Sequence, residues 1–202
     1  MSDRRALILD FGGVLSHPQP EEWFPSTAEA MGVAEDAFRR AYWQHRHAYD
    51  AGLPAEEYWR RVEDTLGRPS RPHLIPRLIQ SDVESWTTYR EDVWAIARSF
   101  RARGGLTAFL SNGVPEAMAR IRAERPLERW FDVVVVSCEV GVAKPDPEIF
   151  RICLSRLGVL PEQALFVDDR ADNIEGAARL GIGTLHFTGD HAVGALRELI
   201  SS

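Results

Sequence analysis

The stretch ALILDFGG, residues 6–13, decides the fold class of this chain. Its four consecutive apolar residues predict a short strand buried on both faces, as in a parallel sheet. The strand ends at Asp10, and the glycines at positions 12 and 13 predict a tight turn with unusual backbone dihedrals. A carboxylate that follows a buried parallel strand lies at the sheet edge where such proteins bind ligands.

Beyond residue 90 the sequence alternates predicted helices and strands. The apolar runs and breakers place strands at 106–110, 133–137, 164–167 and 183–186, and helices at 91–103, 115–122, 147–157, 171–180 and 192–199. This alternation predicts an α/β protein with a doubly wound, Rossmann-like parallel sheet and helices on both faces. Right-handed crossovers then bring the carboxyl ends of all strands to one edge.

The segment between the first strand and this alternating region has a different character. Its apolar residues recur at helical spacing, as in Ala34, Phe38 and Tyr42, and glycines and prolines separate the periodic runs. We predict a small bundle of about four helices without strands. The core domain would then comprise residues 1–17 and 90–202, with residues 18–89 as an inserted domain.

Polar side chains stand where the predicted strands end. They are Asp10, Ser111, Asp168 and Asp169, with Lys144 in the loop after the third strand. Three carboxylates at one edge repel each other unless a cation neutralises them. Oxygen ligands without nearby Cys or His favour Mg²⁺ over zinc. Helix capping by strand-end aspartates is the alternative for each acid alone.

Two further segments suit a phosphate group. The Ser111 hydroxyl, with the backbone N–H groups of Asn112 and Gly113 at a helix start, can hold phosphate oxygens, although a plain helix cap uses the same residues. Lys144 lies in the loop AKPDP, whose prolines stiffen the backbone. Its ammonium could pair with Asp10 and with a phosphoryl group.

Composition sets the remaining bounds. The chain has 202 residues and a net charge of −6, which argues against nucleic acid or an anionic membrane as partner. Cys138 and Cys153 form no disulfide or metal pattern, which suits a reducing cytoplasm. The start MSDRRALILD resembles neither a signal peptide nor a membrane span. The oligomeric state is open.

Four segments together resemble the haloacid dehalogenase superfamily. LILDFGGVL is similar to its motif I, FLSNG to motif II, VAKPDPEIF to motif III and FVDDRADNIEGA to motif IV, in the family's order. The insertion between motifs I and II resembles the helical cap of the first cap class. The wording DFGGVL resembles the branch of sugar-phosphate phosphatases and the N-terminal phosphatase of soluble epoxide hydrolases.

The resemblance implies a phosphatase that acts on a small phosphorylated molecule through an aspartyl-phosphate. Asp10 would attack phosphorus and Ser111 would bind a phosphoryl oxygen, while Lys144 would orient and neutralise. Asp168 and Asp169 would hold Mg²⁺, and which of them binds the metal directly is left open.

The resemblance also assigns supporting positions. The backbone carbonyl of Gly12 would join Asp10 as a metal ligand. Phe11 and Gly12, directly after the nucleophile, would belong to the phosphate site, and Asn173 would support the motif IV loop or serve as an ordinary helix residue.

One position departs from the family pattern. Most phosphatases of this family carry a general acid–base aspartate two residues after the nucleophile, where this chain has Gly12. Such an acid contributes about 10²–10⁴-fold. Three hypotheses follow: a phosphatase with a good leaving group or a borrowed acid, a metal-independent 2-haloacid dehalogenase, and a silent phosphate-binding protein. The Asp168-Asp169 pair argues against the dehalogenase.

The segment AYWQHRHAYDAG, residues 41–52, is the candidate substrate-selecting part of the insertion. Trp43 could stack on an apolar or sugar face, and Arg46 and His47 could meet anionic groups. His45 or His47 could supply the missing proton. Packing within the helical bundle is the alternative for each of these residues.

Overall fold

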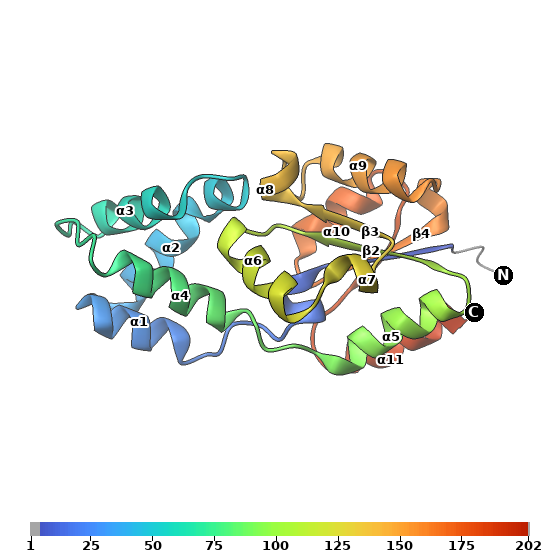
Figure 1. Cartoon of the computed structure of the whole chain (residues 1–202), viewed down its shortest axis with the longest axis horizontal. Helices are drawn as coiled ribbons and strands as arrows, with labels where there is room; N and C mark the ends of the chain where they lie inside the picture. Colours follow the sequence, from blue (N-terminus) through green and yellow to red (C-terminus); the bar gives the residue numbers. More distant parts are fainter. Residues whose placement is uncertain (1–4, 202) are drawn as a thin grey trace.

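The computed structural model describes residues 5–201, in which a group of helices extends from an α/β core (Figure 1). The first four residues lie outside the described part of the chain, as does Ser202. The expectation that the charged start is no signal peptide therefore falls partly on residues that are not described.

The core is built on a five-stranded parallel sheet in the order β3-β2-β1-β4-β5. Its strands are β1 (Ala6–Leu9), β2 (Leu106–Ser111), β3 (Val133–Val136), β4 (Ala164–Asp168) and β5 (Gly183–His186). β1 lies in the centre, where Leu9 pairs with Phe109 on one side and with Val167 on the other. The predicted doubly wound α/β fold is confirmed.

Alternate residues of β1 face opposite helix layers, as the strand period requires. Ala6 and Ile8 belong to the apolar cluster with α9 (Pro147–Leu157) and α10 (Ala171–Ala178). Leu7 and Leu9 belong to the cluster with α5 (Glu91–Ala102) and α11 (His191–Ser201). Figure 1 shows these two helix pairs above and below the sheet. All four strand residues are fully buried, and the side chains of Leu7, Ile8 and Leu9 each contribute about 1.5–3 kcal/mol.

Element boundaries differ slightly from the predictions. Ser111 and Asp168 are the last residues of their strands, and Ser137 lies outside β3 because the β2 ladder ends at the pair Ser111–Val136. The helix α6 (Pro115–Glu124) is close to its prediction. Two single-turn helices and a 3₁₀ turn were not predicted; they are α7 (Leu127–Trp130), α8 (Ser137–Val140) and η2 (Pro161–Gln163).

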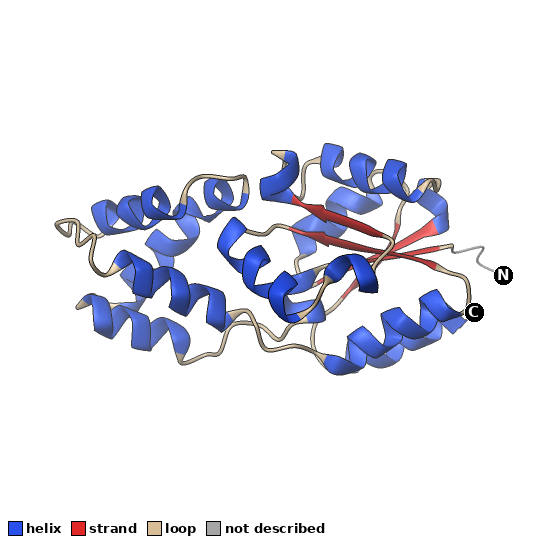
Figure 2. Cartoon of the chain, in the orientation of Figure 1, coloured by secondary structure: helices blue, strands red, loops and turns tan. Residues whose placement is uncertain are grey.

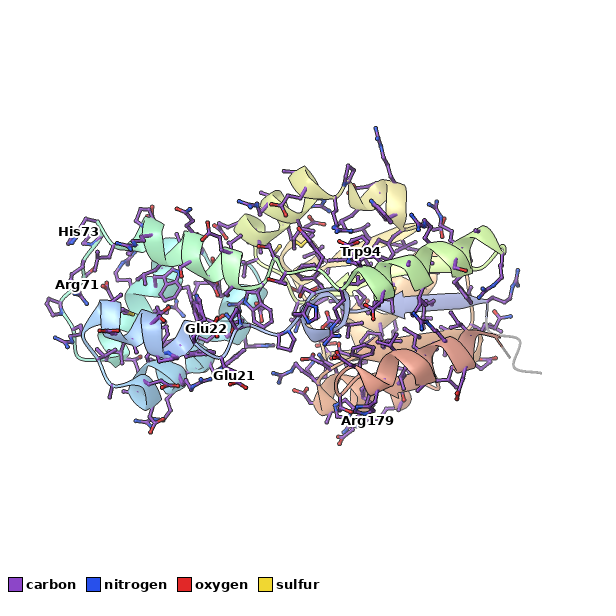
Figure 3. All side chains as sticks on the ribbon, turned by 90° about the horizontal axis from the view of Figure 1, so that it is seen from below. Glu21, Glu22, Arg71, His73, Trp94 and Arg179 are labelled. Atoms are coloured by element: carbon purple, nitrogen blue, oxygen red, sulfur yellow. The ribbon has the colours of Figure 1, made fainter. Side chains whose placement is uncertain are left out.

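The predicted bundle consists of α1 (Trp23–Met31), α2 (Glu35–Asp50), α3 (Ala55–Thr65) and α4 (Ile75–Ser85). We call residues 18–89 the helical insertion; its status as a separate domain stays a prediction. Residues 18–88 contain no strand (Figure 2). Phe38, Tyr42 and Trp59 are fully buried between the helices. Arg71 and His73 lie at the end of the insertion farthest from the core (Figure 3).

Two adjacent segments connect the helical insertion to the core. Ser16 and Tyr89 form an isolated antiparallel bridge, and the His17 amide donates to the Thr88 carbonyl at 2.7 Å. Trp94, labelled in Figure 3, donates its indole N–H to the Leu15 carbonyl at 2.9 Å. These bonds fix the insertion at the carboxyl edge of the sheet.

The insertion also contacts the core across the cleft. The Tyr49 hydroxyl donates to Glu116 of α6 at 3.1 Å, and the Ser137 hydroxyl donates to the Asp50 carbonyl.

None of the helices between residues 5 and 201 combines the length and the apolar character that a bilayer crossing requires.

Candidate active site

A buried lysine joins two of the predicted acids. The Nζ atom of Lys144 lies 2.7 Å from Oδ1 of Asp10 and 2.6 Å from Oδ2 of Asp168, and it donates a third hydrogen bond to the Leu110 carbonyl at 3.1 Å. Lys144 is 2% exposed, and all three of its N–H donors are therefore used. Burial opposes its charge, but Asp10 and Asp168 raise its pKa above the ordinary value.

The loop that carries Lys144 is clamped from two sides. The Asn112 side chain accepts from the Lys144 amide at 2.8 Å and donates to the Lys144 carbonyl at 2.9 Å. On the other side α10 approaches so closely that a Cβ at Gly176 would lie 2.9 Å from the Pro145 carbonyl oxygen. Asn112, predicted to bind phosphate, therefore uses its side chain to position Lys144.

Asp168 is satisfied by protein donors. Besides Lys144 it accepts from the Arg170 amide at 2.9 Å and from the Asn173 side chain at 3.0 and 3.1 Å. Asp168 is fully buried, so these bonds offset the loss of hydration. Asn173 thus supports the motif IV loop, as one of its two predicted roles requires.

Asp169 is partly exposed and lies against the turn that follows β1. Gly13 in that turn has φ +72°, and a Cβ there would lie 2.5 Å from Oδ2 of Asp169. Glycine is therefore required at position 13 both by the left-handed backbone and by the approach of a carboxylate. The imidazole of His186 hydrogen-bonds the Asp169 carbonyl at 2.9 Å and holds the same loop.

The three acids fit one divalent cation. One carboxylate oxygen from each of Asp10, Asp168 and Asp169 lies within 4.8 Å of the others. Burial and the neighbouring acids raise the pKa of Asp10 to about 7, against the opposing charge of Lys144. Burial and Asp168 raise the pKa of Asp169 to about 6. An all-oxygen set of acids, only partly neutralised by one lysine, suits Mg²⁺.

The predicted phosphate-binding segment is only partly available. The Ser111 hydroxyl lines the cavity and has no protein partner among residues 5–201. The Gly113 amide, by contrast, donates to the Ser137 hydroxyl at 3.0 Å. Ser111 therefore has a free donor for a phosphoryl oxygen, whereas the Gly113 amide is already engaged.

The space beside Gly12 belongs to an aromatic ring. A Cβ at Gly12 would lie 3.1 Å from the six-membered ring of Trp86, which directly follows α4. Trp86 was not predicted as a site residue, but it lines the cavity. Phe11 packs beside Phe109 and Tyr89, with ring centroids 5.8 and 6.2 Å apart.

An open cavity of about 510 Å³ lies between the core and the insertion. It brings together most of the predicted site residues, which are Asp10, Phe11, Gly12, Trp43, Arg46, His47, Ser111, Asn112, Gly113, Lys144, Asp169 and Asn173. Asp168 lies behind the lining. His45, a candidate proton donor, is not among the lining residues and is hydrogen-bonded to the Thr65 hydroxyl of α3 at 2.8 Å. Trp43 is 44% exposed, and its indole is accessible at the cavity. The cavity is therefore rimmed by an accessible aromatic surface.

Among the lining residues that were not predicted site residues, five carry a nitrogen or oxygen atom in the side chain. They are Gln19, Asp50, Trp86, Arg170 and Asp172. Asp50 had a local signal, because it stands four residues after Arg46 on one helix and pairs with it at 2.9 Å. Gln19 and Trp86 lie in the connecting segments, where sequence periodicity carries no information.

The family profile of haloacid dehalogenase-like hydrolases matches residues 4–181. The chain belongs to this family. The predicted motifs all fall within the matched range, and the family assignment makes the chain a hydrolase by descent. The resemblance inferred from the four motifs is confirmed.

Curated relatives include several phosphatases. A glyceraldehyde 3-phosphate phosphatase from Methanopyrus kandleri is 48% identical over 77% of this chain and 76% of that protein. A phosphorylated carbohydrates phosphatase from Thermotoga maritima is 30% identical over 92% of this chain and 87% of that protein. Mouse acyl-CoA dehydrogenase family member 10 is 44% identical over 49% of this chain, which spans 9% of that protein. The chain spans 49% of a matching phosphoserine phosphatase from Thermus thermophilus.

Solved structures agree on the fold. A HAD-like family hydrolase from Porphyromonas gingivalis has a TM-score of 0.75, with 24% identity over 98% of both chains. The L-2-haloacid dehalogenase from Xanthobacter autotrophicus has a TM-score of 0.65, with 23% identity over 98% of this chain and 83% of that one. At such identities the likeness supports the fold and leaves the reaction open.

Proposed function

We propose that this chain is a magnesium-dependent phosphomonoester hydrolase that acts through an aspartyl-phosphate on a small phosphorylated molecule. The observation that carries the proposal is the position of Asp10. Its carboxylate is held by Lys144, stands within metal-sharing distance of Asp169, and lines the cavity together with the free Ser111 hydroxyl.

The residues of the chain divide the reaction between them. One oxygen of Asp10 pairs with Lys144, which leaves the other to attack phosphorus while the bond from phosphorus to the ester oxygen breaks. Ser111 donates to a phosphoryl oxygen, and Lys144 neutralises negative charge on Asp10. Water then attacks the phosphorus atom, the bond to Asp10 breaks, and inorganic phosphate leaves. The departing alcohol takes its proton from solvent.

Asp10 and Asp169 are the proposed protein ligands of Mg²⁺, with the Gly12 carbonyl as an expected third. Asp168 already accepts from Lys144, Arg170 and Asn173 and therefore has fewer lone pairs to offer. Asp169 is thus the better direct ligand of the pair. The metal, when bound, would shield the negative charge of the phosphoryl oxygens.

Two alternative functions are tested alongside the proposed phosphatase. The absent acid at Gly12 is compatible with a haloacid dehalogenase, because a halide leaves without a proton. A silent phosphate-binding protein would use the same cavity without turnover. The three-acid cluster supports the metal-dependent phosphatase over both, since neither alternative needs a cation at Asp169. The predicted cytoplasmic location stays a prediction.

Phosphate release from 4-nitrophenyl phosphate should require Mg²⁺. We expect turnover in Mg²⁺ and a loss of about 10²-fold or more in EDTA, because the acids alone repel the phosphoryl group. Chloride release from 2-chloropropionate in EDTA would support the dehalogenase instead. Tight binding of orthovanadate without turnover of any phosphomonoester would support the silent protein.

Restoring the family acid by Gly12→Asp alone should lower kcat/KM. The new Cβ would lie 3.1 Å from the Trp86 ring, so the ring must move by a few tenths of an ångström, and the carboxylate beyond this Cβ needs further room on the same side. Gly12→Ala is the matched control, because it adds the same Cβ without an acid, and we expect a similar loss.

The acid should become useful once the ring is reduced. With Trp86→Phe as background, Gly12→Asp should raise kcat/KM for an alkyl phosphate by about tenfold or more, within the usual range for an acid catalyst. A gain from Gly12→Asp in the unaltered chain would contradict the steric argument.

A further inference from the structure

The positive side chains that line the cavity are all paired with acids. Lys144 pairs with Asp10 and Asp168, as described above. The Arg170 guanidinium pairs with Asp172 at 2.8 Å, and Arg46 pairs with Asp50 at 2.9 Å. His47 is the remaining lining residue that can gain a positive charge.

A second acid, Asp82, also neutralises the charge of Arg46. Its Nη1 atom lies 3.1 Å from Oδ2 of Asp82, which is 1% exposed, and the Tyr42 hydroxyl donates to the same carboxylate at 2.7 Å. Arg46 itself is 9% exposed. Burial raises the pKa of Asp50, while Arg46 lowers it. With two carboxyl groups on one guanidinium, this cluster has no net positive charge in either protonation state of Asp50.

The cluster of Arg46, Asp50 and Asp82, with the neighbouring Gln19, still has a hydrogen-bond donor and an acceptor without protein partners in the described part of the chain. The Arg46 Nε and Nη1 atoms are used, but no hydrogen bond of Nη2 to another described residue is found. The Gln19 side chain donates to the Ser85 hydroxyl at 2.8 Å, and its carbonyl oxygen has no partner within residues 5–201. A donor and an acceptor on one wall suit a hydroxyl group.

We propose that these groups make the insertion select phosphomonoesters whose phosphate is their sole anionic group and whose distal part carries hydroxyl groups. We call this selection against a second anionic group the charge filter. This inference rests on the proposed function and names its substrate class. A second anionic group would meet Asp50 and an arginine whose charge is already cancelled, and such like-charge contacts disfavour a ligand strongly. Arg46 was predicted from the sequence to meet anionic groups of the substrate; in this proposal its Nη2 atom donates to a substrate hydroxyl, because its other donors already pair with Asp50 and Asp82.

Binding of two matched phosphomonoesters tests the filter. Glycerol 3-phosphate and 3-phosphoglycerate differ at one end, which is a hydroxymethyl group in the first and a carboxylate in the second. Calorimetry in Mg²⁺ with the Asp10→Asn chain avoids turnover. We expect Kd for 3-phosphoglycerate to be about tenfold higher or more.

A charge variant assigns the effect to the cluster. Asp50→Asn keeps the shape and the acceptor for Arg46 Nε but removes one negative charge, so it should shrink the Kd ratio by about fivefold. Asp36→Asn, at an exposed acid on the same helix, is the matched control and should leave the ratio unchanged. Circular dichroism melting checks that each variant is folded.

In the Asp10→Asn chain with Asp50 unchanged, 3-phosphoglycerate binding as tightly as glycerol 3-phosphate, or more tightly, would overturn the charge filter. Binding of neither compound would also overturn it. A ratio that Asp50→Asn leaves unchanged in a folded chain would remove the cluster from the explanation and overturn the assignment. Absence of phosphate release from every phosphomonoester would instead refute the proposed function. The ratio of the two Kd values would still test the charge filter, because binding does not require turnover.

Discussion

Asp10→Asn should abolish phosphate release while leaving the fold intact, with a loss in kcat of about 10⁴-fold or more. The amide is nearly the same size as the carboxylate, but it is a poor nucleophile and a weaker ligand for Mg²⁺. Lys144 keeps its bond to Asp168 in this variant, so the loop after β3 should hold its position. Phosphate release under saturating substrate measures the effect.

Stability separates a lost nucleophile from a damaged fold. Burial raises the pKa of Asp10 from 3.8 to about 7, so the folded chain holds this proton more tightly than the unfolded chain does. The ionised carboxylate therefore costs stability increasingly as pH rises through this interval. In EDTA, Asp10→Asn should melt at or above the native temperature, with a larger difference at pH 8 than at pH 4.

Asp36→Asn, at an exposed acid, serves as the control and should retain activity. Native-like turnover in Asp10→Asn would refute the nucleophile. A melting temperature well below that of the native chain at pH 8 in EDTA would contradict the electrostatic account.

Lys144→Met should be the most destabilising single change in the site. The substitution leaves Asp10 and Asp168 buried without their shared cation, and breaking a buried ion pair costs about 3–5 kcal/mol. The variant should also lose about 10²–10³-fold in kcat, because Lys144 no longer neutralises the charge of Asp10 or holds its carboxylate in place. Denaturant unfolding in EDTA and phosphate release in Mg²⁺ measure the two effects.

A double variant tests the mechanism of this loss. Removing the charge of Asp10 as well, in Lys144→Met with Asp10→Asn, should recover part of the lost stability, because one of the two unpaired carboxylates is gone. Mg²⁺ should also stabilise Lys144→Met. A recovery no larger than the stability change that Asp10→Asn produces on its own would mean that Asp10 and Lys144 are not coupled, against the 2.7 Å contact.

Much of the core was predictable because local pattern and topology agree. The strand at 6–9 and the helix at 147–157 have the predicted bounds, since breakers and apolar runs coincide at their ends. Single-turn helices such as α7 were missed, because four residues are too few to establish a helical period. The extent of β3 depended on its partner, since the ladder stops where β2 ends.

The core residues of the site were predictable for a topological reason. Residues at the carboxyl ends of parallel strands meet at one edge whatever the details of packing. Asp10, Ser111 and Asp169 therefore share a cavity with Lys144, as expected. Their division of roles was not visible: the sequence could not show that Asp168 is saturated by donors or that the Gly113 amide is engaged by Ser137.

The amino-acid sequence by itself determined the family, the parallel core and the acids at its edge, because each depends on short segments whose order and spacing are local. Only the tertiary structure decided what surrounds them. Trp86 covers Gly12, and Asp82 cancels the charge of Arg46, although each pair is far apart along the chain. Such contacts depend on how the helical insertion packs against itself and the core, and packing between distant segments leaves no periodic signal.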